Sequence, residues 1–376
     1  MSKKNRIRAD RANNSTPQEP IKPPEPPHRA RWSLVDCIVI GIIILAGCVV
    51  NFIARDFHNG ISRYKQVYWR QEYSGGIVSE LFQFPESFAR DYERMERDLK
   101  VYIYRDRDPG AYFQSPRKLM GMYGSEAYFF ENIKESRFLT NDPLQAHLFF
   151  IPISWHKMRS QGTPYENMII IVENYVQSLI SKYPYWNQTQ GSDHFFVTCH
   201  DIGVEVAERV PFLKKNPIRL VCPASYDTRY NSYKDIALPQ VNQSLSPATV
   251  NRTTRGLWAG IPNSGIRAIL ERLWENDSEL DIPNNLIDTA EGYLLYHNKV
   301  YGTKFCICPR GFPDNTALIA DSIRYGCVPV IMARLSSYLN SPCYDILGWH
   351  NFSIIHQEED VYLLKDTLKG IRCRFH

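Results

Sequence analysis

One long apolar run stands apart from the rest of the chain. Residues 34–54 read LVDCIVIGIIILAGCVVNFIA, in which Asp36 is the one charged side chain. About 20 apolar residues cross a bilayer as a helix, and Trp32 suits the interface at its start. The pattern predicts a transmembrane signal anchor over 32–54. A cleaved signal peptide is the alternative, but its apolar core is shorter and begins nearer the N-terminus.

Beyond residue 98, short apolar runs alternate with segments whose apolar residues recur every three to four positions. Runs that are apolar on both faces are typical of parallel strands covered by helices on each side. A polar stretch at 239–255 divides two such alternations, which predicts an α/β protein of two facing Rossmann-like lobes. The expected strands are 100–104, 147–154, 194–199, 218–222, 256–261, 305–308, 328–332 and 352–355, and the expected helices are 124–135, 165–182, 264–274, 316–325 and 360–371.

The charge around the anchor sets the expected topology. The first 33 residues carry eight Lys and Arg against three acidic residues, whereas the other flank is mixed. The positive-inside rule therefore places the N-terminus in the cytosol and the rest of the chain in a lumen. This explains the basic tail without a nucleic-acid partner. The expected parts are a disordered cytosolic tail (1–31), the anchor (32–54), a stem (55–98), a first lobe (99–245) and a second lobe (246–376).

Sequons and cysteines agree with a lumenal domain. Asn-x-Ser/Thr sequons follow the anchor, and glycans are added on the lumenal side. Seven of the nine cysteines lie there too, where disulfides are permitted and an odd number leaves one free or paired between chains. Cys306 and Cys308 share one face of a strand, which favours burial over a metal site. The expected glycosylated residues are Asn187, Asn242, Asn251, Asn276 and Asn351.

The segment 305–332 carries the clearest chemistry. A buried strand ends at Pro309-Arg310-Gly311, and a helix with polar caps follows. Ligands of doubly wound sheets bind at the carboxyl ends of strands, where a helix N-terminus attracts phosphate. A nearby arginine adds a planar cation, and a helix carboxylate can accept ribose hydroxyls. A nucleotide-diphosphate pocket is one interpretation, and a capped helix with a surface ion pair is the other. The residues assigned to the pocket are Arg310, Gly311, Asn315, Thr316 and Asp321.

Several sequence blocks resemble one known family, in the same order along the chain. They are KVYIY (100–104), DPLQAHLFFIP (142–152), PYWN (184–187), DHFFVTCHDIG (193–203), KFCICPRG (304–311), DSIRYGCVPVI (321–331), and LGW (347–349) with FS (352–353). Together they resemble the exostosin family of glycosyltransferases (family 47), particularly its plant members. The resemblance covers about residues 98–370.

This resemblance implies a fold and an activity. The fold is GT-B, with an N-terminal acceptor lobe and a C-terminal nucleotide-sugar lobe. The activity is inverting transfer from a UDP-sugar onto a polysaccharide or a glycoprotein glycan, by a single-pass type II protein of the Golgi membrane. Neither a cofactor nor an obligatory metal is expected, because protein cations and a helix dipole stabilise the departing UDP.

The block 193–203 is the expected source of the general base. Asp201 or His200, at the end of a strand, could take the proton of the acceptor hydroxyl. The alternative is that both hydrogen-bond the loop backbone. The same structural interpretation is preferred for His194, and His147 is expected to be a satisfied core histidine.

Two departures from the family pattern bear on activity. Many members carry Arg where this chain has Leu318, which removes a cation expected to face the donor diphosphate. The family also continues beyond residue 376, so the C-terminus is expected to be truncated. Both features favour the competing hypothesis of a non-catalytic subunit that forms a hetero-oligomer with an active glycosyltransferase. A glycan-binding receptor ectodomain is a third hypothesis, disfavoured because a nucleotide-type lobe is unusual in a lectin.

Overall fold

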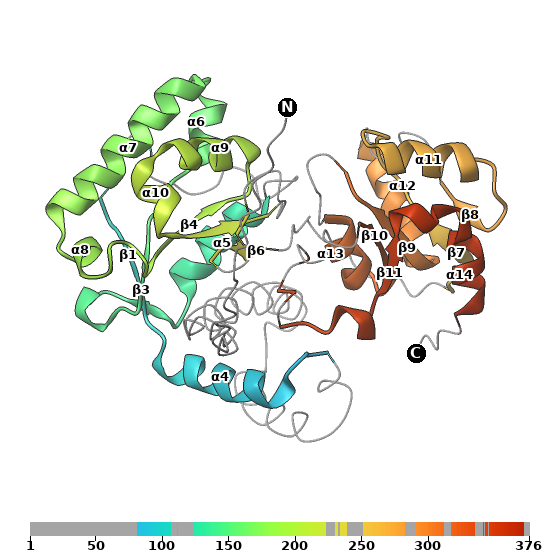
Figure 1. Cartoon of the computed structure of the whole chain (residues 1–376), viewed down its shortest axis with the longest axis horizontal. Coiled ribbons are helices and arrows are strands. Elements are labelled where there is room, and N and C mark those ends of the chain that lie inside the picture. The colour runs from blue at the N-terminus through green and yellow to red at the C-terminus, as the bar shows by residue number, and fades with distance from the viewer. Residues whose placement is uncertain are drawn as a thin grey trace, which may run out of the picture. The chain divides into compact units, whose positions relative to one another are not determined.

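The computed structural model (Figure 1) describes most of the chain after residue 80. The predicted tail, anchor and most of the predicted stem lie outside this part. Among the residues described, no helix is both long and apolar enough to cross a bilayer. The described ranges are 81–106, 111, 124–222, 230–231, 234–238, 251–282, 290–311, 317–334, 341, 343–344 and 346–371.

The first lobe is built on a parallel sheet with the strand order β2-β1-β3-β4-β5-β6. The chain runs from β1 outward to β2 and then crosses back to β3 on the other side of β1. Every later strand extends the sheet in that second direction. The strands are β1 (Val101–Ile103), β2 (Leu139–Thr140), β3 (Leu148–Phe150), β4 (His194–Thr198), β5 (Ile218–Val221) and β6 (Ile236–Ala237).

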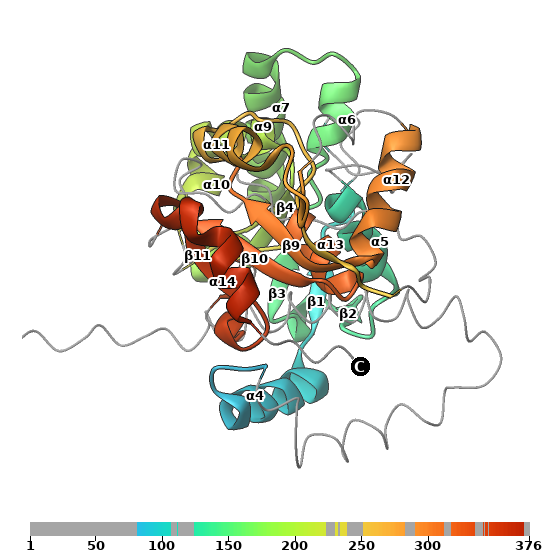
Figure 2. The same ribbon diagram turned by 90° about the vertical axis from the view of Figure 1, so that its right-hand side faces the viewer.

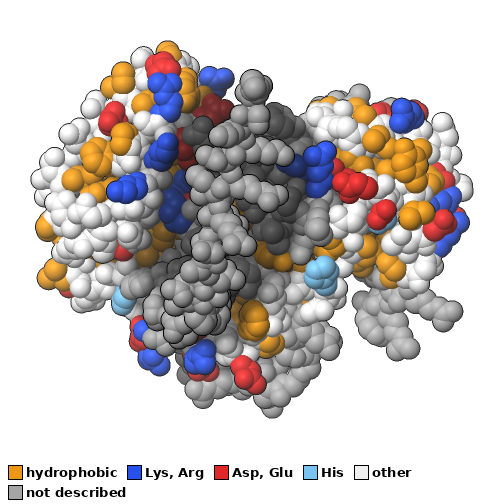
Figure 3. Space-filling model, viewed as in Figure 1, with side chains coloured by type: hydrophobic (Ala, Val, Ile, Leu, Met, Phe, Trp, Pro, Cys, Tyr) orange, Lys and Arg blue, Asp and Glu red, His pale blue; other side chains and the backbone are white. Residues whose placement is uncertain are grey.

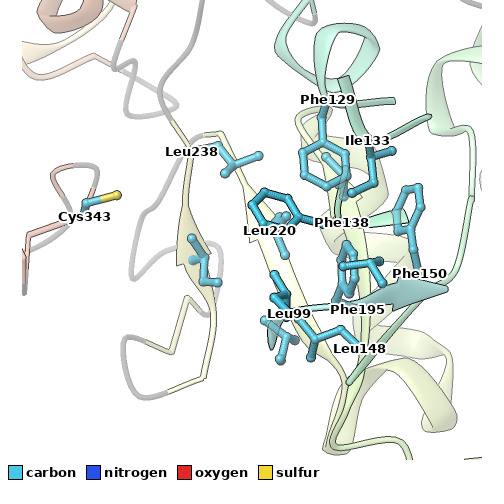
Figure 4. Packing of buried hydrophobic residues seen from close by; sticks show 14 of the residues in the cluster. Leu99, Phe129, Ile133, Phe138, Leu148, Phe150, Phe195, Leu220, Leu238 and Cys343 are labelled. Atoms are coloured by element: carbon cyan, nitrogen blue, oxygen red, sulfur yellow. The ribbon is translucent and has the colours of Figure 1, made fainter. Parts of the chain in front are cut away.

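Helices cover both faces of this sheet, as the two-sided apolar runs predict. On one face, Phe129 packs edge-on against Phe150 and Phe195 (Figure 4). On the other face, Phe149 and Phe196 belong to a second apolar cluster with the inner sides of α7 and α9. The helices are α4 (Pro85–Asp98), α5 (Gly124–Glu135), α6 (Trp155–Ser160), α7 (Tyr165–Lys182), α8 (Tyr185–Thr189), α9 (Asp201–Arg209) and α10 (Pro211–Lys215), with a 3-10 turn, η1 (Pro143–Gln145).

Helix α4 corrects the expected extent of the stem. It lies within 55–98, yet Phe88 and Met95 are buried in the same cluster as the phenylalanines of α5. The segment before it is also tied to the C-terminal half, because the Gly348 N–H donates to the Leu81 carbonyl (2.8 Å). The helix reads PESFARDYERMERD, so its narrow apolar stripe is masked by charged residues. The folded part therefore begins before residue 99.

The second lobe contains another parallel sheet, with the order β11-β10-β9-β7-β8. Side chains of β9 alternate between its faces. Phe305 and Ile307 pack in a cluster with residues of α11 and α14, whereas Cys306 packs with residues of α12. In Figure 2, α11 and α14 lie to one side of β9 and α12 lies to the other. The elements are β7 (Thr254–Leu257), α11 (Gly265–Trp274), β8 (Leu280–Asp281), α12 (Ala290–Tyr301), β9 (Thr303–Pro309), α13 (Ala317–Arg324), β10 (Val328–Ala333), η4 (Trp349–Asn351), β11 (Ile354–Gln357), η5 (Glu358–Leu363) and α14 (Leu364–Gly370).

Charges of both signs are interspersed on the face of the molecule in Figure 3. In the second lobe, for example, Glu279 pairs with Arg255 at 2.6 Å and with Lys369 at 3.0 Å. Solvent-accessible pairs of this kind contribute little to the stability of the folded state. The apolar clusters on the two faces of each sheet therefore supply most of the stabilisation.

Two disulfides join neighbouring strands. Cys199 bonds Cys222, which links the ends of β4 and β5, and Cys306 bonds Cys327, which links β9 to the residue before β10. Cys306 and Cys308 are both buried, as predicted, but Cys306 is a disulfide partner and not merely an apolar core residue. Cys308 has a free, buried thiol, and Cys343 is buried as well. The remaining cysteines, Cys37, Cys48 and Cys373, lie outside the described residues.

Candidate active site

The second sheet has a topological switch point between β7 and β9. From β7 the chain moves outward to β8, and it then returns to the opposite side of β7 to form β9. Where strand order reverses in this way, the two connections leave the sheet in opposite directions and open a crevice beyond the carboxyl ends. The segments that follow β7 and β9 are therefore the first place to look for a ligand site. The segment after β9 is the Pro309-Arg310-Gly311 turn identified in the sequence.

Helix α11 begins at this switch point. The Ser264 hydroxyl, at the N-cap position, donates to the Arg310 carbonyl (2.7 Å) and makes no capping bond to the helix itself. Within the described part of the chain, the Ser264 side chain therefore does not cap the first amides of α11. The amides and the positive dipole end of a helix N-terminus favour an anion at such a position. The helix that meets the Arg310 turn is α11, which the sequence predicts as an ordinary helix without a site role.

Arg267 ties the two strand ends together. It is 6% exposed. Its Nε and Nη2 donate to the Pro309 carbonyl at 3.4 and 3.3 Å, and its Nη1 donates to the Ile261 carbonyl (3.3 Å) and to Asn263 Oδ1 (3.1 Å). One guanidinium thus fixes the segment after β7 against the segment after β9. Sequence reasoning missed this residue, although a cation in the first turn of a helix opposes the dipole and was a usable signal.

Gly311 is required by this arrangement. A Cβ at residue 311 would lie 2.4 Å from Nη2 and 2.7 Å from Cζ of Arg267, closer than non-bonded atoms approach. The backbone can pass the buried guanidinium only because the residue has no side chain. The preceding residue, Arg310, is half-buried. Its N–H donates to the Met332 carbonyl of β10 (3.3 Å). Arg310 and Gly311, both predicted, therefore lie at the switch point.

The remaining predicted donor residues are less directly placed. Asn315 and Thr316 lie outside the described residues. Asp321 is 3% exposed, and its carboxylate adds to the effect of burial in raising the pKa of the Cys308 thiol to about 12. Leu318 is half-buried and packs against apolar residues of three clusters around the sheet. Asp321 is thus buried within the lobe, and Leu318 belongs to its apolar packing.

In the first lobe, His200 and Asp201 follow β4, at the carboxyl edge of the sheet. His200 Nδ1 accepts from the Ile202 N–H (3.3 Å), so His200 is the N-cap of α9. Burial lowers the pKa of His200, and this outweighs the opposing effect of the Asp201 carboxylate, which lies 2.5 Å from Nδ1. Asp201 also accepts from the Ile202 N–H (3.0 Å), and its side chain is 55% exposed. Both residues thus bond loop backbone, as the structural alternative predicts, and Asp201 is also open to solvent.

The turn that carries His200 and Asp201 is held in place by contacts with Thr198 of β4 and with Trp155. The Thr198 hydroxyl donates to the His200 carbonyl (3.0 Å). A Cβ on Gly203 would lie 2.3 Å from Thr198 Oγ1 and 2.7 Å from the ring of Trp155, so α9 approaches the sheet more closely than a larger residue allows. Trp155 in turn donates to the Val197 carbonyl of β4 (2.7 Å). The HDIG sequence therefore combines a cap, an exposed acid and a close helix contact.

The two other histidines differ from each other. His194 is fully buried, with Nε2 at 2.8 Å from the Tyr104 hydroxyl and Nδ1 at 2.7 Å from Asp193. It is structural, as predicted, although its partners are side chains. His147 is exposed, so its assignment to the core is wrong. Its Nδ1 nevertheless accepts from the Lys100 N–H (3.1 Å) and so is satisfied.

A buried acid that the sequence did not indicate lies at the same edge. Glu126, in the first turn of α5, is 3% exposed. Its Oε2 accepts from the Cys199 N–H (3.2 Å), the residue that precedes His200. Burial raises the pKa of Glu126 to about 8, against the smaller lowering effect of the bond from Cys199. Only the three-dimensional pairing of α5 with β4 places this carboxyl group at the edge.

Glycosylation and metal binding can be considered only for the described residues. Within them, the predicted glycosylated residues are all exposed; Asn242 is not described. The described part contains no group of three or more His, Cys, Asp or Glu side chains that could hold a metal ion. The exposed sequon residues are Asn187, Asn251, Asn276 and Asn351.

Two lobes, each with a parallel sheet between helices and a strand order that reverses beside its first strand, define a GT-B-like protein. A family model described as the exostosin GT47 domain matches residues 95–371, and the chain belongs to this family of glycosyltransferases. The resemblance seen in the sequence blocks is therefore confirmed.

Curated plant proteins are similar over most of this chain. A "probable glycosyltransferase" of Arabidopsis thaliana is 33% identical over 302 residues, which are 76% of this chain and 57% of the relative. The "probable beta-1,4-xylosyltransferase IRX10L" of the same plant is 26% identical over 304 residues (73% and 71%). The "probable glucuronosyltransferase 47 A" of Physcomitrium patens is 26% identical over 301 residues (72% and 65%). The first relative and two further Arabidopsis thaliana proteins are each named "probable glycosyltransferase", and this chain spans 57–64% of their lengths.

Proposed function

We propose that this protein transfers a sugar from a UDP-sugar to a polysaccharide of the hemicellulose or pectin type, with inversion at the anomeric carbon. Membership of the GT47 family supports a nucleotide-sugar donor and a polysaccharide acceptor. Relatives named as xylosyltransferases and glucuronosyltransferases support a cell-wall polysaccharide. A glycoprotein glycan is the acceptor alternative.

The observation that carries the proposal is the switch point of the second lobe. The N-terminus of α11, the Arg310 turn and the close approach at Gly311 all meet there, and Arg267 holds them in place. A diphosphate matches this site because its anionic oxygens suit the positive end of a helix and a planar guanidinium. We therefore place the UDP moiety against this turn.

The proposed chemistry is one displacement. The acceptor hydroxyl attacks the anomeric carbon, loses its proton to a base and expels UDP. Arg310 and the N-terminus of α11 would stabilise the negative charge that develops on the departing diphosphate. Protein groups would thus supply the electrostatic role that a metal ion has in other transferases, so no obligatory metal is proposed.

The proposed location is the Golgi membrane, with the anchor at 32–54 and the lobes in the lumen. The charge bias around the anchor and the exposed sequon residues support this orientation. The competing function, a non-catalytic subunit of a hetero-oligomer, is favoured by the apolar Leu318, which brings no charge to the donor side.

A donor panel tests the proposal. The full chain in detergent is mixed with UDP-xylose, UDP-galactose, UDP-arabinose or UDP-glucuronic acid and with xylan or pectin oligosaccharides. We expect UDP release and a lengthened oligosaccharide with one donor, and loss of both in Gly311→Ala but not in Gly370→Ala, at the end of α14, whose new methyl group meets nothing within 4 Å. UDP binding without transfer from any donor would favour the non-catalytic subunit.

A further inference from the structure

Glu126 is a buried carboxyl group at the edge where the first sheet presents its strand ends. Its Oε2 is held by the Cys199 N–H, directly after β4. Among the described residues, no other hydrogen bond and no cation is found at this carboxylate. One oxygen is therefore anchored by the protein, while the other retains its capacity to accept from a hydroxyl group.

The neighbouring titratable groups do not neutralise it. Strands β2, β3 and β4 pack against α5; β2 brings only Leu139 and Thr140, and β3 (Leu148–Phe150) brings no titratable side chain. On β4, the His194 side chain lies on the opposite face of the sheet from α5, where its Nε2 hydrogen-bonds the Tyr104 hydroxyl. Beyond β4, His200 and Asp201 both accept from the Ile202 N–H at the start of α9, and the Asp201 carboxylate lies beside His200 Nδ1. Glu126 is thus a buried acid of this edge to which the described surroundings supply no opposing charge.

An ionisable group at this position lowers the stability of the folded state. Burial raises the pKa of Glu126 to about 8, so ionisation in the folded state opposes folding. A glutamine could accept the same bond from Cys199 without that cost. Acidic side chains with a strongly shifted pKa and no ion-pair partner, located where a sheet binds its ligand, are typical of proton-transfer sites. Such residues are retained for function although they lower the stability of the folded state. A carboxyl group whose pKa lies near the working pH suits a general base.

We propose that Glu126 is the proton acceptor of the transfer reaction, in place of Asp201 or His200. The proposal rests on the proposed function. The acceptor oxygen forms its new bond to the anomeric carbon, and its proton passes to the Glu126 carboxylate. The bond between the anomeric carbon and the phosphate oxygen breaks, and its electron pair leaves with UDP. Asp201, already engaged at the start of α9, then serves to cap the turn.

The test compares Glu126→Gln and Asp201→Asn across pH. The full chain is given the UDP-sugar and oligosaccharide panel, and both transfer and UDP affinity are measured. In the unsubstituted protein, transfer should rise with pH as Glu126 ionises near pH 8. Glu126→Gln should lose about 100-fold or more of the transfer rate and this pH dependence, and should keep UDP affinity within about twofold. Glu126→Asp should regain part of the rate, and Asp201→Asn should retain it.

The outcomes separate the two proposals. If Glu126→Gln binds UDP and transfers sugar within about fivefold of the unsubstituted rate, the role of Glu126 is refuted and the proposed function stands. The same holds if Asp201→Asn, and not Glu126→Gln, loses transfer and its pH dependence. If the unsubstituted chain neither binds UDP nor consumes a donor, the proposed function falls, and the role of Glu126 falls with it.

Discussion

The buried acid of the first lobe gives a prediction about stability that is independent of activity. The pKa of Glu126 is about 8 in the folded state, against an ordinary value of 4.5. Between these values the unfolded chain has released the proton and the folded chain still holds it. The free energy of unfolding therefore falls as pH rises through this window, by about 1.4 kcal/mol per pH unit. Above about pH 8 both states are ionised and the loss is complete.

Glu126→Gln should remove this dependence. The amide oxygen can still accept from the Cys199 N–H, so the packing is kept while the titration is lost. Between roughly pH 5.5 and 7.5, the free energy of unfolding of the unsubstituted protein should fall by about 2.7 kcal/mol relative to that of the variant. Denaturant unfolding at several pH values, followed by tryptophan fluorescence, measures the difference.

The matched control for this experiment is Glu135→Gln, at the exposed end of the same helix. Its unfolding free energy should track that of the unsubstituted protein at every pH. If Glu126→Gln also gives a parallel curve, the carboxyl group is not held neutral by burial, and both the stability argument and the case for a proton acceptor fail.

The donor site gives three further predictions. Gly311→Ala should cost about 1–3 kcal/mol of stability and weaken UDP binding, because its methyl group meets the guanidinium of Arg267; equal melting temperatures and affinities for Gly311→Ala and the control Gly370→Ala would count against this packing. Arg267→Met leaves the Pro309 and Ile261 carbonyls without their donor and should cost about 1–3 kcal/mol, whereas Arg272→Met, on the exposed side of the same helix, should be neutral in thermal unfolding. Excess EDTA should leave UDP binding and transfer unchanged, and activity that is lost with EDTA and restored by Mg²⁺ or Mn²⁺ would contradict a metal-free mechanism.

Local pattern was enough to predict much of the fold. The apolar spacing of 165–182 gives the bounds of α7, and that of 124–135 gives the bounds of α5. Strands β1, β3, β4, β5, β9, β10 and β11 were also predicted, because buried parallel strands are apolar on both faces, whereas the two-residue strands β2, β6 and β8 are too short to show a pattern. Helix α4 was missed because charged side chains surround its two buried apolar residues, which gives the segment the composition of a stem.

The candidate site was only partly predictable, for a physical reason. Arg310 and Gly311 follow a recognisable strand, so the carboxyl-end rule locates them. Arg267 and Glu126 act through contacts with residues 42 and 73 positions away along the chain. Their neighbours come from strand order and helix packing, which short-range periodicity does not specify. The role of Asp321 as a ribose ligand stays a prediction, and the structure adds that its carboxylate is buried.

The central claim is that the second lobe binds a nucleotide diphosphate at the turn after β9. Titration of the full chain with UDP by calorimetry tests it most directly. We expect saturable binding at one site with a dissociation constant below about 1 mM, equivalent to more than about 4 kcal/mol of binding free energy, and weaker binding in Gly311→Ala than in Gly370→Ala. No heat of binding at millimolar UDP, or equal affinity in the two glycine variants, would contradict it.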